Sequence, residues 1–256
     1  MKITIIWALA LQVITINLFA QLGPGGTGFV NGHLIEPNTN LSLSKPKYLS
    51  AGYYHNLAIK NDGSIVCQGW NEYSQSTTPK NLVEAIYVAG GYHHSIAVLS
   101  SGDVVTWGRN NYGQLDIPDG LVAIQSISAG REHCLALSDK GTVTAWGRND
   151  SGESNVPENL IDVMQIAAGY FHSLALKKDG TVQAWGSNKY GEISIPSNLN
   201  NVISIAAGGN HSLALKADGT VIAWGRNIYG QTNIPDGLED VKSITAGTAH
   251  NSALLN

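Results

Sequence analysis

Six histidines recur along this chain at a fixed interval of 39 residues. Imidazole nitrogens bind metal ions readily, so a regular histidine column suggests a metal-binding ring. Each histidine opens the second strand of a repeated unit, however, one strand spacing (~4.8 Å) outside the innermost strand. Six side chains at that radius cannot converge on one ion, so we expect each to bond neighbouring backbone and fix a tight turn. The column consists of His55, His94, His133, His172, His211 and His250.

Other catalytic groupings are missing from the sequence. It contains no serine-centred nucleophile elbow, no glycine-rich phosphate loop and no pair of carboxylates recurring beside a candidate base. We therefore predict a protein that is not an enzyme and that uses no cofactor or metal. An enzyme is kept as the weakest alternative, because some repeat folds assemble their sites from scattered loops.

The repeated unit predicts three strands. In the fifth copy, apolar runs and alternation mark residues 203–208, 211–215 and 220–225. Asp218-Gly219 between the last two is the strongest short hairpin signal, because both turn residues can take positive φ. A proline follows the third strand in five copies, in an outer segment where its missing N–H costs no ladder bond.

A strict period of this length indicates one supersecondary unit that is copied and stacked, and helix-free units stacked radially form an all-β propeller. The chain ends after the second strand of its sixth unit, and a degenerate match to the unit lies in residues 21–47. We expect this segment to pair with the C-terminal strands and close a β-propeller of about six blades. An open or truncated array is the alternative.

The N-terminus has the form of a signal peptide over residues 1–20, with Lys2 ahead of an apolar stretch. An uncleaved membrane anchor is the alternative. The predicted organisation is a leader (1–20), a blade-completing segment (21–47) and the repeat propeller (48–256), in a secreted or periplasmic monomer that leaves the membrane once the leader is cleaved. The net charge is −4 and there is no basic run, which argues against nucleic-acid binding.

Two kinds of residue are interpreted as packing. A tryptophan column on the third strand should fill the wedge between diverging blades, and in the first unit Trp70 stands two residues later on the same face. Cys67 and Cys134 belong to different strands of different units, so we expect two free thiols. The tryptophan column is Trp107, Trp146, Trp185 and Trp224.

The copies differ most in the two residues before each histidine. These residues lie in the tight loops between first and second strands, so all six loops emerge on one face. Aromatic, arginine and histidine side chains there are typical of a protein-binding patch, because large rigid groups bury area at low entropy cost. The alternative is that they merely suit the turn. The candidate partner-binding residues are Tyr53, Tyr54, Tyr92, His93, Arg131, Glu132, Tyr170 and Phe171.

A second variable set follows the third strand, and a tyrosine stands three residues later in four copies. We expect the tyrosines to close the outer turn of the blade and the arginines to be exposed. The sequence leaves open whether this set shares a face with the loops. The set is Trp70, Arg109, Arg148, Ser187 and Arg226, with Tyr73, Tyr112, Tyr190 and Tyr229.

The pattern Ala-Gly-x-x-His-Ser-Leu-Ala-Leu-x-x-Asp-Gly-x-Val-x-Ala-Trp-Gly-x-Asn-x-x-Gly-Gln resembles the repeat of the regulator of chromosome condensation family over about residues 48–256. The short unit, its Ile-Pro linker and the leader are more similar still to the secreted bacterial propellers that inhibit β-lactamases. That resemblance implies a face of aromatic loops that grips a partner protein. Two departures are that the last two loops, Gly209-Asn210 and Thr248-Ala249, lack aromatics, and that the inhibitor has seven blades.

We therefore predict a secreted, non-enzymatic propeller that binds a partner protein through loops on one face, with a β-lactamase as one candidate partner. A cell-surface or carbohydrate-binding module is the first alternative, suggested by the tyrosine column. A guanine-nucleotide-exchange regulator is the second, implied by the family resemblance but disfavoured by the leader and the acidic balance.

Overall fold

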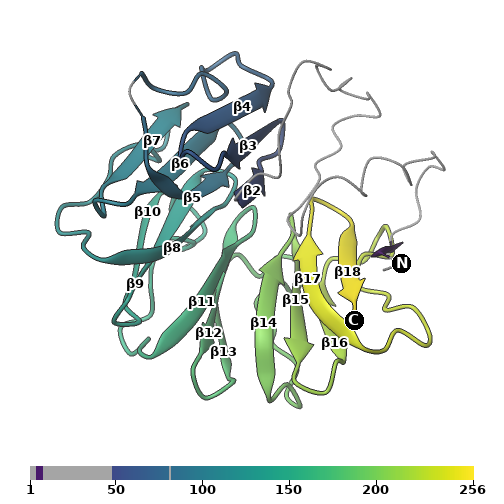
Figure 1. The fold of residues 1–256 in the computed structure, drawn as a ribbon. Coiled ribbons are helices and arrows are strands. Elements are labelled where there is room, and N and C mark those ends of the chain that lie inside the picture. The colour runs from purple at the N-terminus through teal and green to yellow at the C-terminus, as the bar shows by residue number, and fades with distance from the viewer. Residues whose placement is uncertain (1–3, 8–47, 81) are drawn as a thin grey trace.

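Residues 4–7, 48–80 and 82–256 are described by a computed structural model, and within them the chain forms strands and no helix. The strands make six three-stranded sheets that follow one another around the molecule (Figure 1). The all-β propeller of about six blades is thereby confirmed. The sheets are β2 (Tyr48–Ala51), β3 (His55–Ile59) and β4 (Ile65–Gly69); β5 (Ala85–Gly90), β6 (His94–Leu99) and β7 (Val104–Gly108); β8 (Ile124–Ala129), β9 (His133–Ser138) and β10 (Val143–Gly147); β11 (Val163–Ala168), β12 (His172–Lys177) and β13 (Val182–Gly186); β14 (Val202–Ala207), β15 (His211–Lys216) and β16 (Val221–Gly225); and β17 (Val241–Ala246), β18 (Asn251–Leu255) and β1 (Thr4–Trp7).

The sixth sheet joins the two ends of the chain. Strand β1 pairs antiparallel with β18, with Thr4 opposite Leu254 and Trp7 opposite Asn251 (Figure 1). Pairing of an N-terminal strand with the C-terminal strands is confirmed, but this strand comes from the predicted leader, whose cleavage would remove it. The paired strand lies within residues 1–20, whereas the segment predicted for the role, residues 21–47, lies outside the described residues.

The Asp-Gly hairpins differ from the expected turn. Gly180 has φ of 80°, but Asp179 is not among the residues with positive φ. The Lys177 N–H donates to the carbonyl of Thr181 (2.9 Å), and the Gly180 N–H donates back to the carbonyl of Lys177 (3.0 Å). The loop therefore has three residues, with the glycine as a bulge, and only the glycine needs positive φ.

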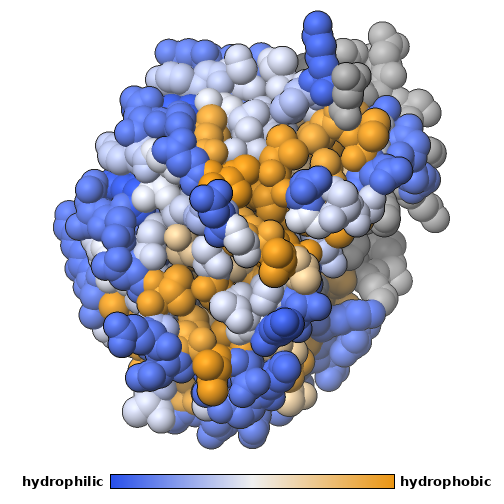
Figure 2. All heavy atoms as spheres, turned by 90° about the vertical axis from the view of Figure 1, so that its left-hand side faces the viewer, coloured by the Kyte–Doolittle hydropathy of each residue, from blue (hydrophilic) through white to orange (hydrophobic). Residues whose placement is uncertain are grey.

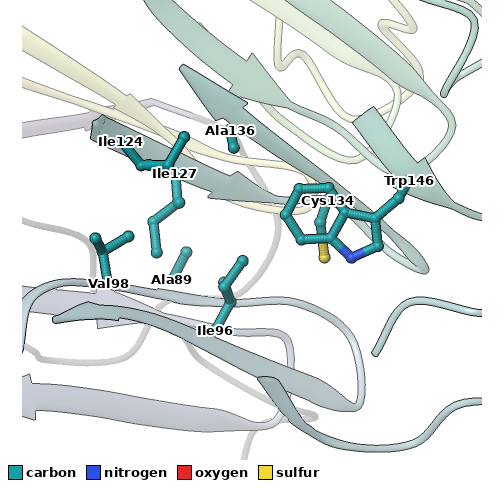
Figure 3. Close-up of a cluster of buried hydrophobic side chains, with 8 residues drawn as sticks. All are labelled: Ala89, Ile96, Val98, Ile124, Ile127, Cys134, Ala136 and Trp146. Carbon is teal, nitrogen blue, oxygen red and sulfur yellow. The ribbon is translucent and has the colours of Figure 1, made fainter. Parts of the chain in front are cut away.

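The apolar core lies between neighbouring blades. One cluster combines Val98 of β6 with Ile127 of β8 and Trp146 of β10, and Figure 3 shows Ile127 pointing from the third sheet toward Ala89 of the second. The four column tryptophans are 6–7% exposed, as expected of wedge fillers. The two cysteines are free, which is also as predicted, and Cys134 is fully buried in this cluster.

Each of the first five histidines is buried and ties its blade to the next. His172 Nε2 lies 3.0 Å from Ser212 Oγ in the following blade. That hydroxyl donates to the carbonyl of Glu192 (2.8 Å), which also accepts from Trp224 Nε1 (2.9 Å). Because the hydroxyl's own proton is used, His172 Nε2 must be the donor. The expected structural role is correct, but the partner is a neighbouring side chain and not local backbone.

The same tie recurs with small changes of partner. The histidine contacts Ser95, Cys134, Ser173, Ser212 or Asn251 in the next blade. The equivalent position of the first unit is Asn56, which is exposed. Burial lowers the pKa of His172 to about 3, so the ring is neutral at neutral pH. A Cβ on Gly169 would overlap this imidazole, which explains the glycine three residues before each histidine.

The outer surface mixes apolar and hydrophilic side chains. Figure 2 shows this on the side of the second and third sheets, where apolar areas alternate with hydrophilic ones. Exposed apolar residues such as Val122, Ile161 and Ile203 occur in several units, so apolar surface alone does not identify a binding face. In the described part of the chain no helix is long and apolar enough to cross a membrane.

Candidate functional site

The loops between first and second strands surround one hollow of about 110 Å³. All six units contribute three consecutive residues at the end of their innermost strand, so the hollow lies where the six inner strands end, and we call it the channel mouth. We call this side of the molecule the loop face. The variable residues at the rim of the hollow are Tyr53, Tyr92, Arg131, Tyr170, Gly209 and Thr248.

The predicted binding residues meet beside this hollow. The ring centroid of Tyr53 lies 4.4 Å from that of Tyr92 and 5.7 Å from that of Tyr170. Tyr54 stacks on His93 with 5.5 Å between centroids and 14° between planes. Aromatic residues from the first, second and fourth units therefore form one continuous surface, the loop cluster, defined as the eight candidate residues taken together.

The two charged members of the loop cluster have different environments. The guanidinium carbon of Arg131 lies 4.7 Å from the ring centroid of Tyr92 and 5.2 Å from that of Phe171. Glu132 is only 5% exposed and pairs with Arg148 (3.3 Å) and Arg109 (3.7 Å). Glu132 therefore presents little surface to a partner, and its buried carboxylate holds the side chains of Arg109 and Arg148 in position.

The second variable set shares the loop face. His94 pairs with Gly108 across β6 and β7, so the end of the third strand lies beside the start of the second. The Arg109 N–H donates to the carbonyl of His93 (2.8 Å). Arg109 and Arg148 are partly buried rather than exposed, and Trp70 is 53% exposed beside Tyr54 instead of filling a wedge. The shared face could have been predicted from the sequence, because in three consecutive antiparallel strands the end of the third lies beside the start of the second.

Three of the four tyrosines of the second set are exposed, and Tyr73 is half-buried. Tyr112, Tyr190 and Tyr229 are 41%, 38% and 48% exposed. Their main chains close the outer turn as expected, because the Tyr112 N–H donates to the side-chain oxygen of Gln114 (2.9 Å). Gln114 also accepts from Trp146 Nε1 (3.1 Å) through its own carbonyl. This buried column was not singled out from the sequence, although its residues end a Gly-x-Asn-x-x-Gly-Gln/Glu motif in four copies and the same motif with Ser74 for the second glycine in the first copy. The column is Gln75, Gln114, Glu153, Glu192 and Gln231.

The last two loops lack aromatics because Tyr170 occupies their space. Its hydroxyl lies 2.9 Å from Thr248 Oγ1, two units further along the chain. The ring crosses Gly209, where an added Cβ would lie 3.2 Å from the ring and 2.7 Å from the carbonyl of Thr248. Main-chain bonds also join these loops, from the Tyr170 N–H to Gly209 (3.0 Å) and from the Gly209 N–H to Thr248 (3.1 Å). The loop face is therefore preorganised.

The aromatic part of the loop cluster is uncharged at neutral pH. Burial, followed by the nearby Arg109, lowers the pKa of His93. The hydrogen bond with Tyr92 raises the pKa of Tyr54, and burial raises that of Tyr170. Across residues 48–80 and 82–256 no three His, Cys, Asp or Glu side chains are grouped to hold a metal ion. Rigid neutral rings with a few guanidinium groups are suited to binding rather than to proton transfer.

Solved structures with the same fold include Prp20p from Saccharomyces cerevisiae (TM-score 0.70, 20% identity, covering 82% of this chain and 68% of that one). Human WBSCR16 is similar at TM-score 0.67 and 21% identity, covering 83% and 72%. The ectodomain of the Physcomitrella patens receptor kinase CR4 matches at TM-score 0.67 and 24% identity, covering 78% and 58%. At these identities the likeness shows the fold alone.

Among curated proteins, none matches this chain in sequence. The resemblance to β-lactamase inhibitors stays a prediction. The repeat pattern itself is matched in five copies, over residues 47–75, 85–114, 124–153, 163–192 and 202–231, more than half of the chain. This protein belongs to the regulator of chromosome condensation (RCC1) repeat family.

Proposed function

We propose that this protein is a secreted, non-catalytic binding module that holds a partner protein against the loop cluster. The observation that carries the proposal is that side chains from four separate units, chosen as variable in sequence, converge around one hollow on one face. Repeats that agree elsewhere have been diversified where their loops meet, as expected of a surface under selection for a partner.

The fold supports this use. Among the similar structures, Prp20p binds Gsp1p and histones, and yeast RCC1 (Prp20) has been solved bound to Kap60, with TM-score 0.66 and 22% identity to this chain. Propellers of this repeat type therefore bind proteins, although the partner and the surface used here are proposals. The preorganised aromatic loops lower the entropy cost of such binding.

The test is a capture experiment on the full chain. Material from the native extracellular medium, with a purified class A β-lactamase as a direct candidate, is presented to the wild type and to a Tyr170→Ala/Phe171→Ala double variant. We expect the double variant to bind its partner ~2 kcal/mol more weakly or worse, because buried aromatic anchors dominate interface energies.

The matched control is Val122→Ala/Ile161→Ala, which removes exposed apolar groups (68% and 63% exposed) near the opposite ends of the inner strands. This variant should bind as the wild type does. Equal binding by wild type and the aromatic double variant would place the binding surface elsewhere.

A carbohydrate-binding module is the second candidate. The exposed rings of Tyr112, Tyr190 and Tyr229 favour it, because aromatic faces at the surface can stack on sugar rings. A glycan array is the discriminating measurement, and the absence of any glycan bound through these tyrosines would remove this candidate.

A further inference from the structure

Among the described residues that line the channel mouth, Arg131 is the one that carries a charge. Its guanidinium carbon lies within 4.7–5.8 Å of the ring centroids of Tyr92, Phe171 and Tyr170. Rings contact a guanidinium through its face, whereas its N–H donors point outward in its plane. The stacking therefore fixes the group in place without using its donors.

Those donors have no partner within the described part of the chain. Arg131 makes no ion pair and no side-chain hydrogen bond there, and its Nε is buried without an acceptor. The Nε of Arg109 and that of Arg226 are buried without an acceptor as well. Arg109 and Arg148 differ from Arg131 in that both form ion pairs with the carboxylate of Glu132. Arg131 is thus a held, unneutralised cation, and a buried donor without an acceptor is costly to the free protein.

The size of the hollow beside Arg131 limits which chemical group could enter it and accept hydrogen bonds from the guanidinium. Its volume of about 110 Å³ is small, because sites for drug-sized ligands usually measure ~300–1,000 Å³. A phosphate group is usually held by several cationic side chains, yet the two nearest arginines are already paired with Glu132. A single planar carboxylate matches a single guanidinium in shape and charge.

We propose that an aspartate or glutamate side chain, projecting from a loop of the partner protein, enters the channel mouth and forms an ion pair with Arg131 while flanking residues pack on Tyr53, Tyr92 and Tyr170. This inference rests on the proposed function and deepens it, because it assigns the partner's anchor a chemical class. The aromatic walls exclude water from the pair, so it should contribute specificity as well as affinity.

The experiment uses a displayed library of disulfide-closed ten-residue loops, unbiased at every position, selected on the full chain. Loops that still bind the Tyr170→Ala/Phe171→Ala variant are discarded. We expect the remaining loops to share an Asp or Glu at one position. With a synthetic loop as the probe, Asp→Asn or Glu→Gln in the loop and Arg131→Met in the protein should each weaken binding about tenfold or more, and together no further.

Controls separate charge from packing. Arg131→Lys keeps the charge and should bind better than Arg131→Met. Arg226→Met removes an arginine that stacks on Tyr190 and Tyr229 away from the hollow, and it should leave affinity unchanged. If Arg131→Met also loosens the fold, the exchange Arg131→Glu with a lysine in the loop decides, because restored binding requires direct charge pairing.

The outcomes are distinguishable. Loops that depend on Tyr170 and Phe171, carry no shared acid and bind Arg131→Met normally would overturn this inference and leave the proposed function standing. If no selected loop depends on the aromatic pair, the binding role of the loop cluster fails, and the role of Arg131 fails with it.

Discussion

The interfaces between blades and the loop face are built from the same repeat but use it in opposite ways. At the interfaces the residues agree from copy to copy, as in the buried tie of His172, Ser212 and Trp224. On the loop face the residues that immediately precede each histidine differ in every copy. Residues that are the same in most units therefore hold neighbouring blades together. Residues that vary between units are the ones available to recognise a partner.

The largest expected effect is loss of the blade interfaces in acid. Burial lowers the pKa to about 4 for His55 and to about 3 for His94, His133 and His172. The unfolded chain therefore binds protons first as pH falls below about 6.5, and stability that is complete above this pH declines toward pH 3. At pH 5 each of these histidines should lower the free energy of unfolding by about 2 kcal/mol relative to neutral pH, and the four together should lower it by about 8 kcal/mol.

Denaturant unfolding monitored by tryptophan fluorescence from pH 7.5 to 4.5 measures this decline. The four buried column tryptophans report on the interfaces directly. A free energy of unfolding that stays flat over this range would show that the histidines are accessible to protons in the folded state, and would remove the contrast with the loop face.

The next largest effect is expected from one interface tie. His172→Ala removes a fully buried ring and leaves Ser212 without its donor, which should cost ~3 kcal/mol of unfolding free energy through the cavity and the lost hydrogen bond. Chemical denaturation gives the loss. Partner affinity of the folded fraction should be unchanged, since His172 lies beneath the loop face, and a selective loss of affinity would contradict the division of roles.

A smaller effect sharpens the boundary between the two regions. Gly209→Ala places a Cβ 3.2 Å from the ring of Tyr170 and 2.7 Å from the carbonyl of Thr248. We expect the Tyr170–Thr248 contact to break, with a cost of about 1–2 kcal/mol in stability from overpacking. Partner affinity should fall as well, because the rim loses its preorganised ring.

Tyrosine fluorescence during unfolding measures the stability lost in Gly209→Ala. Isothermal titration calorimetry measures its loss of partner affinity. A Thr248→Val variant is the matched control, because it removes the hydroxyl contact of Tyr170 without adding bulk beneath the ring. If Gly209→Ala changes neither stability nor affinity, Tyr170 is not held across the fifth loop.

The smallest effect should come from exchanging equivalent parts of the repeat. Cys134 stands where three other units have serine, and its sulfur lies 3.2 Å from His94 Nε2. Cys134→Ser should therefore change stability by less than ~0.5 kcal/mol, because serine reproduces the same donor and acceptor. Thermal unfolding of the two proteins side by side tests this, and a loss above 2 kcal/mol would mean that each interface is individually fitted.

Much of the interface region was predictable from residue pattern. The 39-residue period, the strands and the packing role of Trp146 follow from local periodicity. The partner of each histidine did not follow, because Ser212 lies 40 residues beyond His172 and approaches it only when blades stack. The Asp-Gly turn was also placed correctly, but its three-residue geometry depends on main-chain hydrogen bonds that the dipeptide does not specify.

The candidate site was predictable as a set of residues but not as a surface. That the loops share a face follows from the strand order, and the same order could have placed Arg109 beside His93. The inward position of Glu132 could not be foreseen, because it depends on two arginines from different units. Trp70 was misplaced because an alternation argument fails once the strand has ended, and β4 ends at Gly69.

By itself the sequence determined the repeat, the strand pattern and which positions vary, because these depend on contacts within about one unit of chain. Only the tertiary structure decided which varied side chains touch. Tyr170 meets Thr248 across 78 residues and Tyr53 across the hollow, and such meetings depend on the curvature of the ring and the direction of each side chain. The distance between two units across the propeller therefore cannot be read from their spacing along the chain.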